Sequence, residues 1–129
     1  MAEPSQSPGW VQRVLLWGVW LTLLGVWTVG LLVPEPHRAL GTVEVFETWR
    51  FAIAKLFHLS AYGLLAALAW RLPLGHHGRV VLIALLALHG AATELLQQFI
   101  PTRTGSLLDV AIDWTGTTLG AVASWKWSR

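Results

Sequence analysis

The chain has 129 residues, of which 54% are hydrophobic and only 12% charged. This is about half the charged share of an average soluble domain, and a soluble domain of this length could not bury so much apolar surface. The formal net charge of +2 comes from Lys and Arg residues scattered at segment ends, which argues against a nucleic-acid-binding protein. The lack of cysteine excludes disulfides and thiolate chemistry.

The first apolar segment follows a short polar stretch. Residues 1–12 contain two prolines and are predicted to be a disordered cytoplasmic N-terminus. Residues 14–33 carry no charge and end at Pro34. At about 1.5 Å per residue, a helix of this length crosses a hydrocarbon core of about 30 Å. A cleaved signal peptide is the alternative, but its apolar core is usually shorter and no small-x-small cleavage site precedes Pro34.

Three more apolar runs follow, at about residues 51–70, 80–100 and 107–125. The charged segment 34–50 is long enough for a short interfacial helix, residues 71–79 form a basic turn, and residues 101–106 make a tight connection. Short loops predict antiparallel neighbouring helices. We therefore expect an all-α fold, a single four-helix transmembrane bundle over residues 13–127.

The distribution of positive charge predicts the orientation of this bundle. With four spans both termini share one side of the membrane, and that side carries five Lys and Arg residues against three on the other. Cytoplasmic segments are enriched in Lys and Arg. We therefore expect both termini in the cytoplasm of a cell membrane, with residues 34–50 and 101–106 facing outward.

Five ionisable residues inside the apolar runs share one depth, and each costs about 2.5–3.5 kcal/mol on insertion scales. At the helical rise they all lie roughly 3–10 Å below the outward surface. Groups from three helices at one depth can pair with each other. These residues are Lys55, His58, Glu94, Asp109 and Asp113.

Helical phase supports a shared site for the second and third spans. Lys55, His58 and Tyr62 are spaced i, i+3, i+7 and share a helix face, and Glu94 and Gln97 are spaced i, i+3. His89 lies roughly 140° around the third helix from Glu94, at about 100° per residue, and is left out of the predicted site.

The fourth span carries its carboxylates on the same stripe as two glycines. Asp109, Asp113, Gly116 and Gly120 are spaced i, i+4, i+7 and i+11. A Gly-x-x-x-Gly pair lets another helix backbone come close. We therefore predict that Gly116 and Gly120 serve helix packing and that the stripe faces the bundle interior.

Structural alternatives apply to several of these residues. Lys55 could extend outward past its own helix end. A carboxylate at Asp109 is favoured near any helix N-terminus, and Arg103 could be only a loop arginine. Asp113, a full turn deeper, has no such explanation. His58 with Tyr62, and Glu94 with Gln97, could be hydrogen-bonded clamps between helices.

The polar positions resemble those of the VanZ-like family of small bacterial membrane proteins. The resemblance covers roughly residues 51–121. Where the family commonly has an acidic residue this chain has Ala54, and where it commonly has asparagine this chain has Asp113. The matching pattern is Lys55-x-x-His58-x-x-x-Tyr62, Glu94-x-x-Gln97-x-Phe99-x-Pro101-x-Arg103 and Asp109-x-x-x-Asp113-x-x-Gly116-x-x-x-Gly120.

The resemblance implies a bacterial inner-membrane protein related to an accessory factor in resistance to the glycopeptide antibiotic teicoplanin. Our first hypothesis is a polar site that binds a cell-envelope lipid head group, with membrane lipids or a lipid-linked envelope precursor as partners. Lys55, His58 and Arg103 would act as donors beside the carboxylates.

Two alternatives to head-group binding stay open. An intramembrane enzyme could use His58 as a general base while Glu94 or Asp113 orients it or holds a divalent cation, although no convincing nucleophile is present. A structural polar network in an envelope complex is the other. We assign no cofactor, resident metal or nucleic-acid partner from the sequence, and an oligomer stays open.

Overall fold

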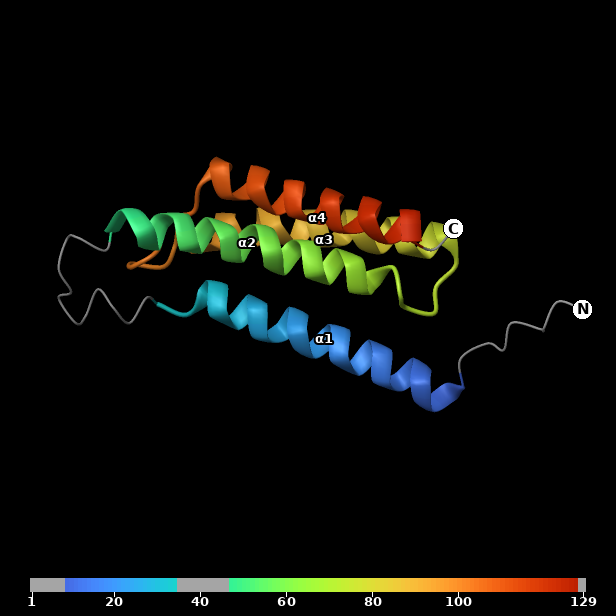
Figure 1. The fold of residues 1–129 in the computed structure, drawn as a ribbon. Helices are drawn as coiled ribbons and strands as arrows, with labels where there is room; N and C mark the ends of the chain where they lie inside the picture. Colours follow the sequence, from blue (N-terminus) through green and yellow to red (C-terminus); the bar gives the residue numbers. More distant parts are fainter. Residues whose placement is uncertain (1–8, 35–46, 128–129) are drawn as a thin grey trace, which may run out of the picture.

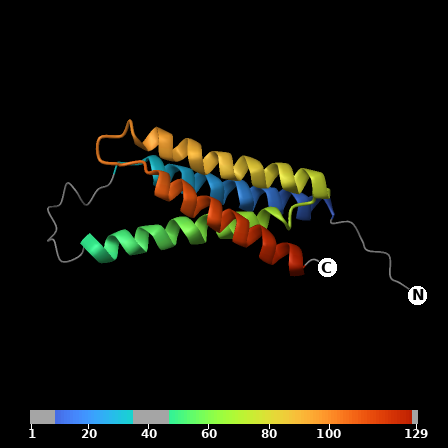
Figure 2. The same ribbon diagram turned by 90° about the horizontal axis from the view of Figure 1, so that it is seen from above.

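The structure is a computed structural model that describes residues 9–34 and 47–127. Within those ranges it contains four α-helices and no strand: α1 (Trp10–Leu32), α2 (Glu47–Ala69), α3 (His76–Gln97) and α4 (Leu107–Trp127). The helices lie lengthwise beside one another, and the start of α1 and the end of α4 lie at the same end of the bundle (Figures 1 and 2). The predicted all-α, four-helix fold is confirmed.

Three of these helices are long and apolar enough to cross a membrane: α1, α2 over Trp49–Ala69, and α3. Their outer surfaces remain apolar after packing, since Val14 and Leu15 of α1 are each more than 60% exposed, as is Leu88 of α3. Lipid is the solvent that tolerates such a surface. The chain is therefore a membrane protein, while α4, with two aspartates in 21 residues, remains a predicted fourth span.

The helices begin and end a few residues from the predicted positions. α1 begins at Trp10, so residues 10–12 are helical rather than disordered, and α3 begins at His76 inside the predicted basic turn. Polar residues can continue a helix because its backbone groups bond within the segment, as the amide of Arg79 does to the carbonyl of Gly75. An apolar run therefore indicates which part of a helix lies in the membrane better than it indicates where the helix begins and ends.

Other boundaries shift for similar reasons. α2 takes in residues 47–50 from the segment that could form an interfacial helix, and the rest of that prediction lies outside the described residues, as does the prediction for residues 1–8. α3 ends at Gln97, and residues 98–100 form a turn before Pro101. Proline disfavours helical backbone in the residue before it.

α2 and α4 meet backbone to backbone along glycines. A Cβ atom on Gly116 would overlap the carbonyl oxygen of Leu59, and one on Gly120 would overlap that of Gly63. Small residues at such seams permit close van der Waals packing between membrane helices. This seam holds the inward stripe of α4 against α2 and so brings their polar side chains together.

α1 packs beside α2 and α3 (Figure 1), and its contacts with α2 include aromatic side chains. Trp20 is buried in the apolar core, and its indole N–H donates to the carbonyl of Leu65, 2.9 Å away. Trp27 lies two turns further along the same face of α1 and contacts His58 edge-on, with ring centroids 5.5 Å apart. α1 thereby forms one wall of the polar region.

Candidate functional site

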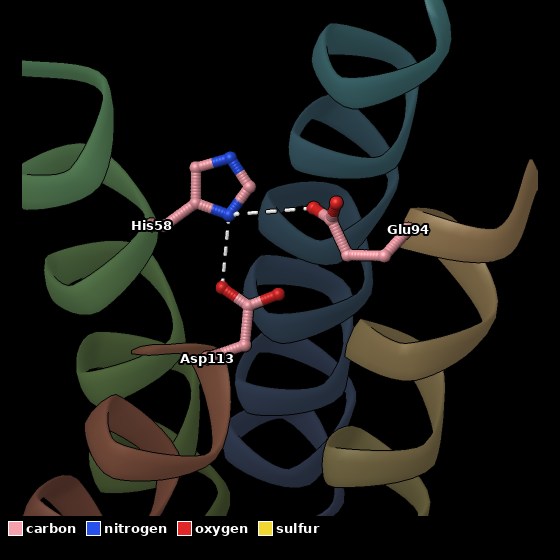
Figure 3. Close-up of side chains that lie close together, drawn as sticks. All are labelled: His58, Glu94 and Asp113. Carbon is pink, nitrogen blue, oxygen red and sulfur yellow. Dashed lines mark hydrogen bonds and ion pairs between the residues drawn. The ribbon is translucent and has the colours of Figure 1, made fainter. Parts of the chain in front are cut away.

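A triad of side chains from three helices occupies the bundle interior. His58 comes from α2, Glu94 from α3 and Asp113 from α4, and their polar ends converge (Figure 3). The Nδ1 atom of His58 lies 2.9 Å from Oδ1 of Asp113 and 3.8 Å from Oε1 of Glu94. Asp113 is fully buried and Glu94 is 2% exposed. The three residues form a buried acid–histidine cluster.

A second pair of charges lies next to this triad, nearer the bundle end. Lys55 forms an ion pair with Asp109, and its side chain is 20% exposed. Ser106 donates its hydroxyl to Oδ2 of Asp109 at 2.9 Å and its backbone N–H to Oε2 of Glu94 at 3.0 Å. Ser106 therefore joins the partly exposed ion pair to the buried triad.

Helix capping explains why Ser106 and Asp109 hold these positions. Ser106 immediately precedes α4, and its hydroxyl accepts the N–H of Asp109 at 3.1 Å. This is the bond by which an N-cap serine satisfies one of the unpaired amides of a first helical turn. The Ser-x-x-Asp spacing is visible in the sequence, but residues 101–106 are predicted from the sequence only as a tight connection.

Several buried polar atoms of the site lack a partner. Within the described residues, no hydrogen-bond partner reaches Oε1 of Glu94, Oδ2 of Asp113 or Nε2 of Gln97. All three side chains are at most 4% exposed. Unsatisfied buried polar groups are rare in folded proteins, and each calls for an explanation such as an ion, a water or a functional role.

The charges of the site are unbalanced. Glu94, Asp109 and Asp113 face Lys55 and His58, and Lys55 is already paired with Asp109. Two buried carboxylates beside one imidazole are stable only if a proton or a cation compensates them. The deeper part of the site therefore needs a proton or a cation to balance its negative charge.

A chain of hydrogen bonds extends the site toward α1. Tyr62 lies 3.0 Å from Nδ1 of His89 and His89 Nε2 lies 2.9 Å from the hydroxyl of Thr28. Since Thr28 donates its own proton to the carbonyl of Leu24, it accepts from Nε2–H, which leaves Nδ1 of a neutral His89 to accept from Tyr62.

The exclusion of His89 from the polar network was wrong. The prediction compared the position of His89 only with that of Glu94 on the same helix. His89 instead contacts Tyr62 of α2 from another side of α3. Thr28 is part of the same network and lies in a run that carries no charge. A histidine in an apolar span was the available signal, because an intramembrane ionisable residue needs a partner.

Arg103 contacts the end of α1. The sequence hypothesis places it among the donors at the polar site, but its guanidinium donates to the carbonyls of Gly30 at 2.7 Å and Val33 at 2.9 Å, at the end of α1. The last carbonyls of a helix lack partners within that helix. Arg103 therefore ties the loop between α3 and α4 to α1.

Two further glycines, not assigned to the site from sequence, make room for it. A Cβ atom on Gly90 would lie 3.1 Å from Oδ2 of Asp113, and one on Gly105 would overlap the carbonyl oxygen of Glu94. Each glycine lets a neighbouring segment approach α3 closely. Isolated glycines in a helix or loop are too common to be singled out without coordinates.

Comparisons with protein-family models, curated proteins and solved structures found no match for this chain. The resemblance to the VanZ-like family therefore stays a prediction based on the polar pattern itself. Functional inference depends on the chemistry of the site.

Proposed function

We propose that the chain is a multi-pass protein of the cell membrane that binds the polar head group of a cell-envelope lipid at the end of the bundle where α2 and α4 begin. The observation that carries the proposal is the partly exposed Lys55–Asp109 pair, located next to buried carboxylates and joined to them by Ser106. Intramembrane ionisable residues are functional candidates by default because of their insertion cost.

The arrangement suits a head group that carries both a phosphate and an amine. Lys55 supplies a cationic donor for the phosphate, and the carboxylate of Asp109, whose oxygens have lone pairs beyond those bonded to Lys55 and Ser106, supplies an acceptor for the amine. Hydrogen bonds to charged groups contribute about 1.5–3 kcal/mol each. An accessory role in the response to glycopeptide antibiotics follows from the VanZ-like resemblance and belongs to the same proposal.

Lys55→Ala should weaken this binding. Loss of one charge-assisted contact corresponds to a decrease in affinity of about ten- to a hundredfold. The measurement is retention of phosphatidylethanolamine by detergent-purified protein in native mass spectrometry, with phosphatidylcholine as the lipid that lacks amine donors. Lys126→Ala is the matched control, since Lys126 is exposed in the last turn of α4 at the opposite end.

Equal retention by the wild type, Lys55→Ala and Lys126→Ala would refute head-group binding at this site. If Lys55→Ala then lowered only thermal stability, the structural alternative would hold, in which the polar network sets helix register. The enzyme alternative has weaker support, because Ser60 is exposed on α2 and the Ser106 hydroxyl is bonded to Asp109.

A further inference from the structure

We infer that His58, Glu94 and Asp113 form a binding site for a divalent transition-metal ion, with Zn²⁺ as the ion that fits best. Each residue offers one ligand atom, and the three atoms lie within 4.8 Å of one another. They come from three different helices and point into one space (Figure 3). The site would therefore pin α2, α3 and α4 together.

The spacing of the ligand atoms matches a coordination sphere. Zinc binds imidazole nitrogen and carboxylate oxygen at about 2.0–2.2 Å, so neighbouring ligands in tetrahedral or octahedral geometry lie about 2.8–3.6 Å apart. The His58 nitrogen lies 2.9 Å from Asp113 Oδ1 and 3.8 Å from Glu94 Oε1. The distance to Asp113 lies within this range, and a rotation of the Glu94 side chain toward the other two ligands would close the sphere.

A second, independent observation is that two buried carboxylate oxygens lack a hydrogen-bond donor. Oε1 of Glu94 and Oδ2 of Asp113 have no hydrogen-bond partner among the described residues. The other oxygen of Glu94 is held by the N–H of Ser106 at 3.0 Å, which leaves Oε1 directed at His58. A metal ion satisfies such oxygens without a donor.

Charge and ligand chemistry select the class of ion. Two carboxylates and a neutral imidazole carry a charge of −2, which a divalent ion cancels in a low-dielectric interior. Imidazole favours transition metals such as zinc over Mg²⁺ and Ca²⁺, which prefer all-oxygen coordination. His58 would bind the ion through Nδ1 as a neutral imidazole that keeps its one proton on Nε2, and if the ring is an imidazolium before binding, its second proton is released to water.

Asp109 is not a ligand in this arrangement. Its two oxygens are taken by Lys55 and by the Ser106 hydroxyl. His89, another histidine of the described residues, bonds to Tyr62 and Thr28 instead. These two residues supply a matched aspartate and a matched histidine against which the proposed ligands can be tested.

The test measures zinc binding by purified full-length protein without a histidine tag. The background carries His76→Gln and His77→Gln, because these exposed adjacent histidines could bind zinc by themselves. Protein is stripped with a chelator and reloaded with Zn²⁺. The metal-to-protein ratio is measured by plasma mass spectrometry and the affinity by competition with a chromophoric chelator.

We expect about one Zn²⁺ per chain in the background protein. Loss of a second-shell partner alone costs about 10–100-fold in metal affinity, so His58→Gln and Asp113→Asn should each lose at least that much. Asp109→Asn and His89→Gln should retain binding within a few-fold. Absence of zinc in the background protein, or the same affinity in all four variants, would overturn the proposal.

If the ligand variants fail to fold, a spectroscopic measurement on the background protein tests the site instead. Co²⁺ bound in the background protein should show the visible absorption of a four- or five-coordinate ion, and Zn²⁺ should displace it. Folded protein that lacks these bands would equally overturn the site. The inference does not rest on head-group binding, because Lys55 is outside the ligand set and its variant should bind zinc normally.

Discussion

Individual side chains of the site differ in how many of their polar atoms have a hydrogen-bond or ion-pair partner. Asp109 is held by Lys55 and Ser106, whereas Asp113 is one turn deeper and fully buried, and among the described residues its side chain is bonded to the imidazole of His58 through one oxygen. Two aspartates four residues apart on one helix face thus have different environments. Asp109 belongs to the helix cap, and Asp113 belongs to the buried cluster.

Ser106→Ala should destabilise the start of α4. The change removes the hydroxyl that accepts from the amide of Asp109 and donates to its carboxylate. Loss of an N-cap serine costs about 0.5–2 kcal/mol. The check is the free energy of unfolding in detergent, with Ser106→Thr as the conservative control. An unchanged value for Ser106→Ala would show that the cap contributes nothing to stability.

The elements depend on one another most at the seam between α2 and α4. This seam has backbone contact at Gly116 and Gly120, where no side chain larger than hydrogen fits. Because it holds Lys55 and His58 of α2 against Asp109 and Asp113 of α4, the site requires the seam. A disruption there should therefore affect both stability and ligand binding.

Gly120→Val should separate α2 from α4. Its side chain would overlap the carbonyl of Gly63, and overpacking of this kind costs about 1–3 kcal/mol or more. Gly25→Val on α1 is the matched control, since a Cβ there meets no atom of the described residues within 4 Å. Thermal unfolding in detergent measures both. Equal melting temperatures would contradict close packing at the seam.

At the scale of the whole molecule, the polar site lies toward the end of the bundle where α1 and α3 end and α2 and α4 begin. The opposite end holds the starts of α1 and α3 (Figure 1). Which end faces the cell exterior follows only from the charge distribution. Head-group binding in the outer leaflet requires the polar end to face outward.

The lack of cysteine makes this orientation directly testable. Single-cysteine variants Gly9→Cys and His77→Cys lie at one end of the bundle, and Thr104→Cys lies at the other, all at exposed positions. With both termini in the cytoplasm, a membrane-impermeant maleimide should label only Thr104→Cys in intact cells. The reverse labelling pattern would place the polar site on the cytoplasmic side.

The sequence alone determined the helices and the stripe of α4, because apolar length and helical phase are local properties. It also indicated which polar residues lie at one depth, since depth follows from the count along each span. These local rules hold for Lys55, His58, Glu94, Asp109 and Asp113, all of which lie in contacting pairs.

Only the tertiary structure decided which polar side chains of different segments pair with each other. The docking of α2 against α4 pairs Asp109 with Lys55, and pairs Asp113, one turn deeper on the same face, with His58. Docking of α1 places Thr28 on His89, and the loop carries Arg103 to the end of α1. Such contacts depend on side-chain packing between segments distant in sequence, which periodicity within one helix does not encode.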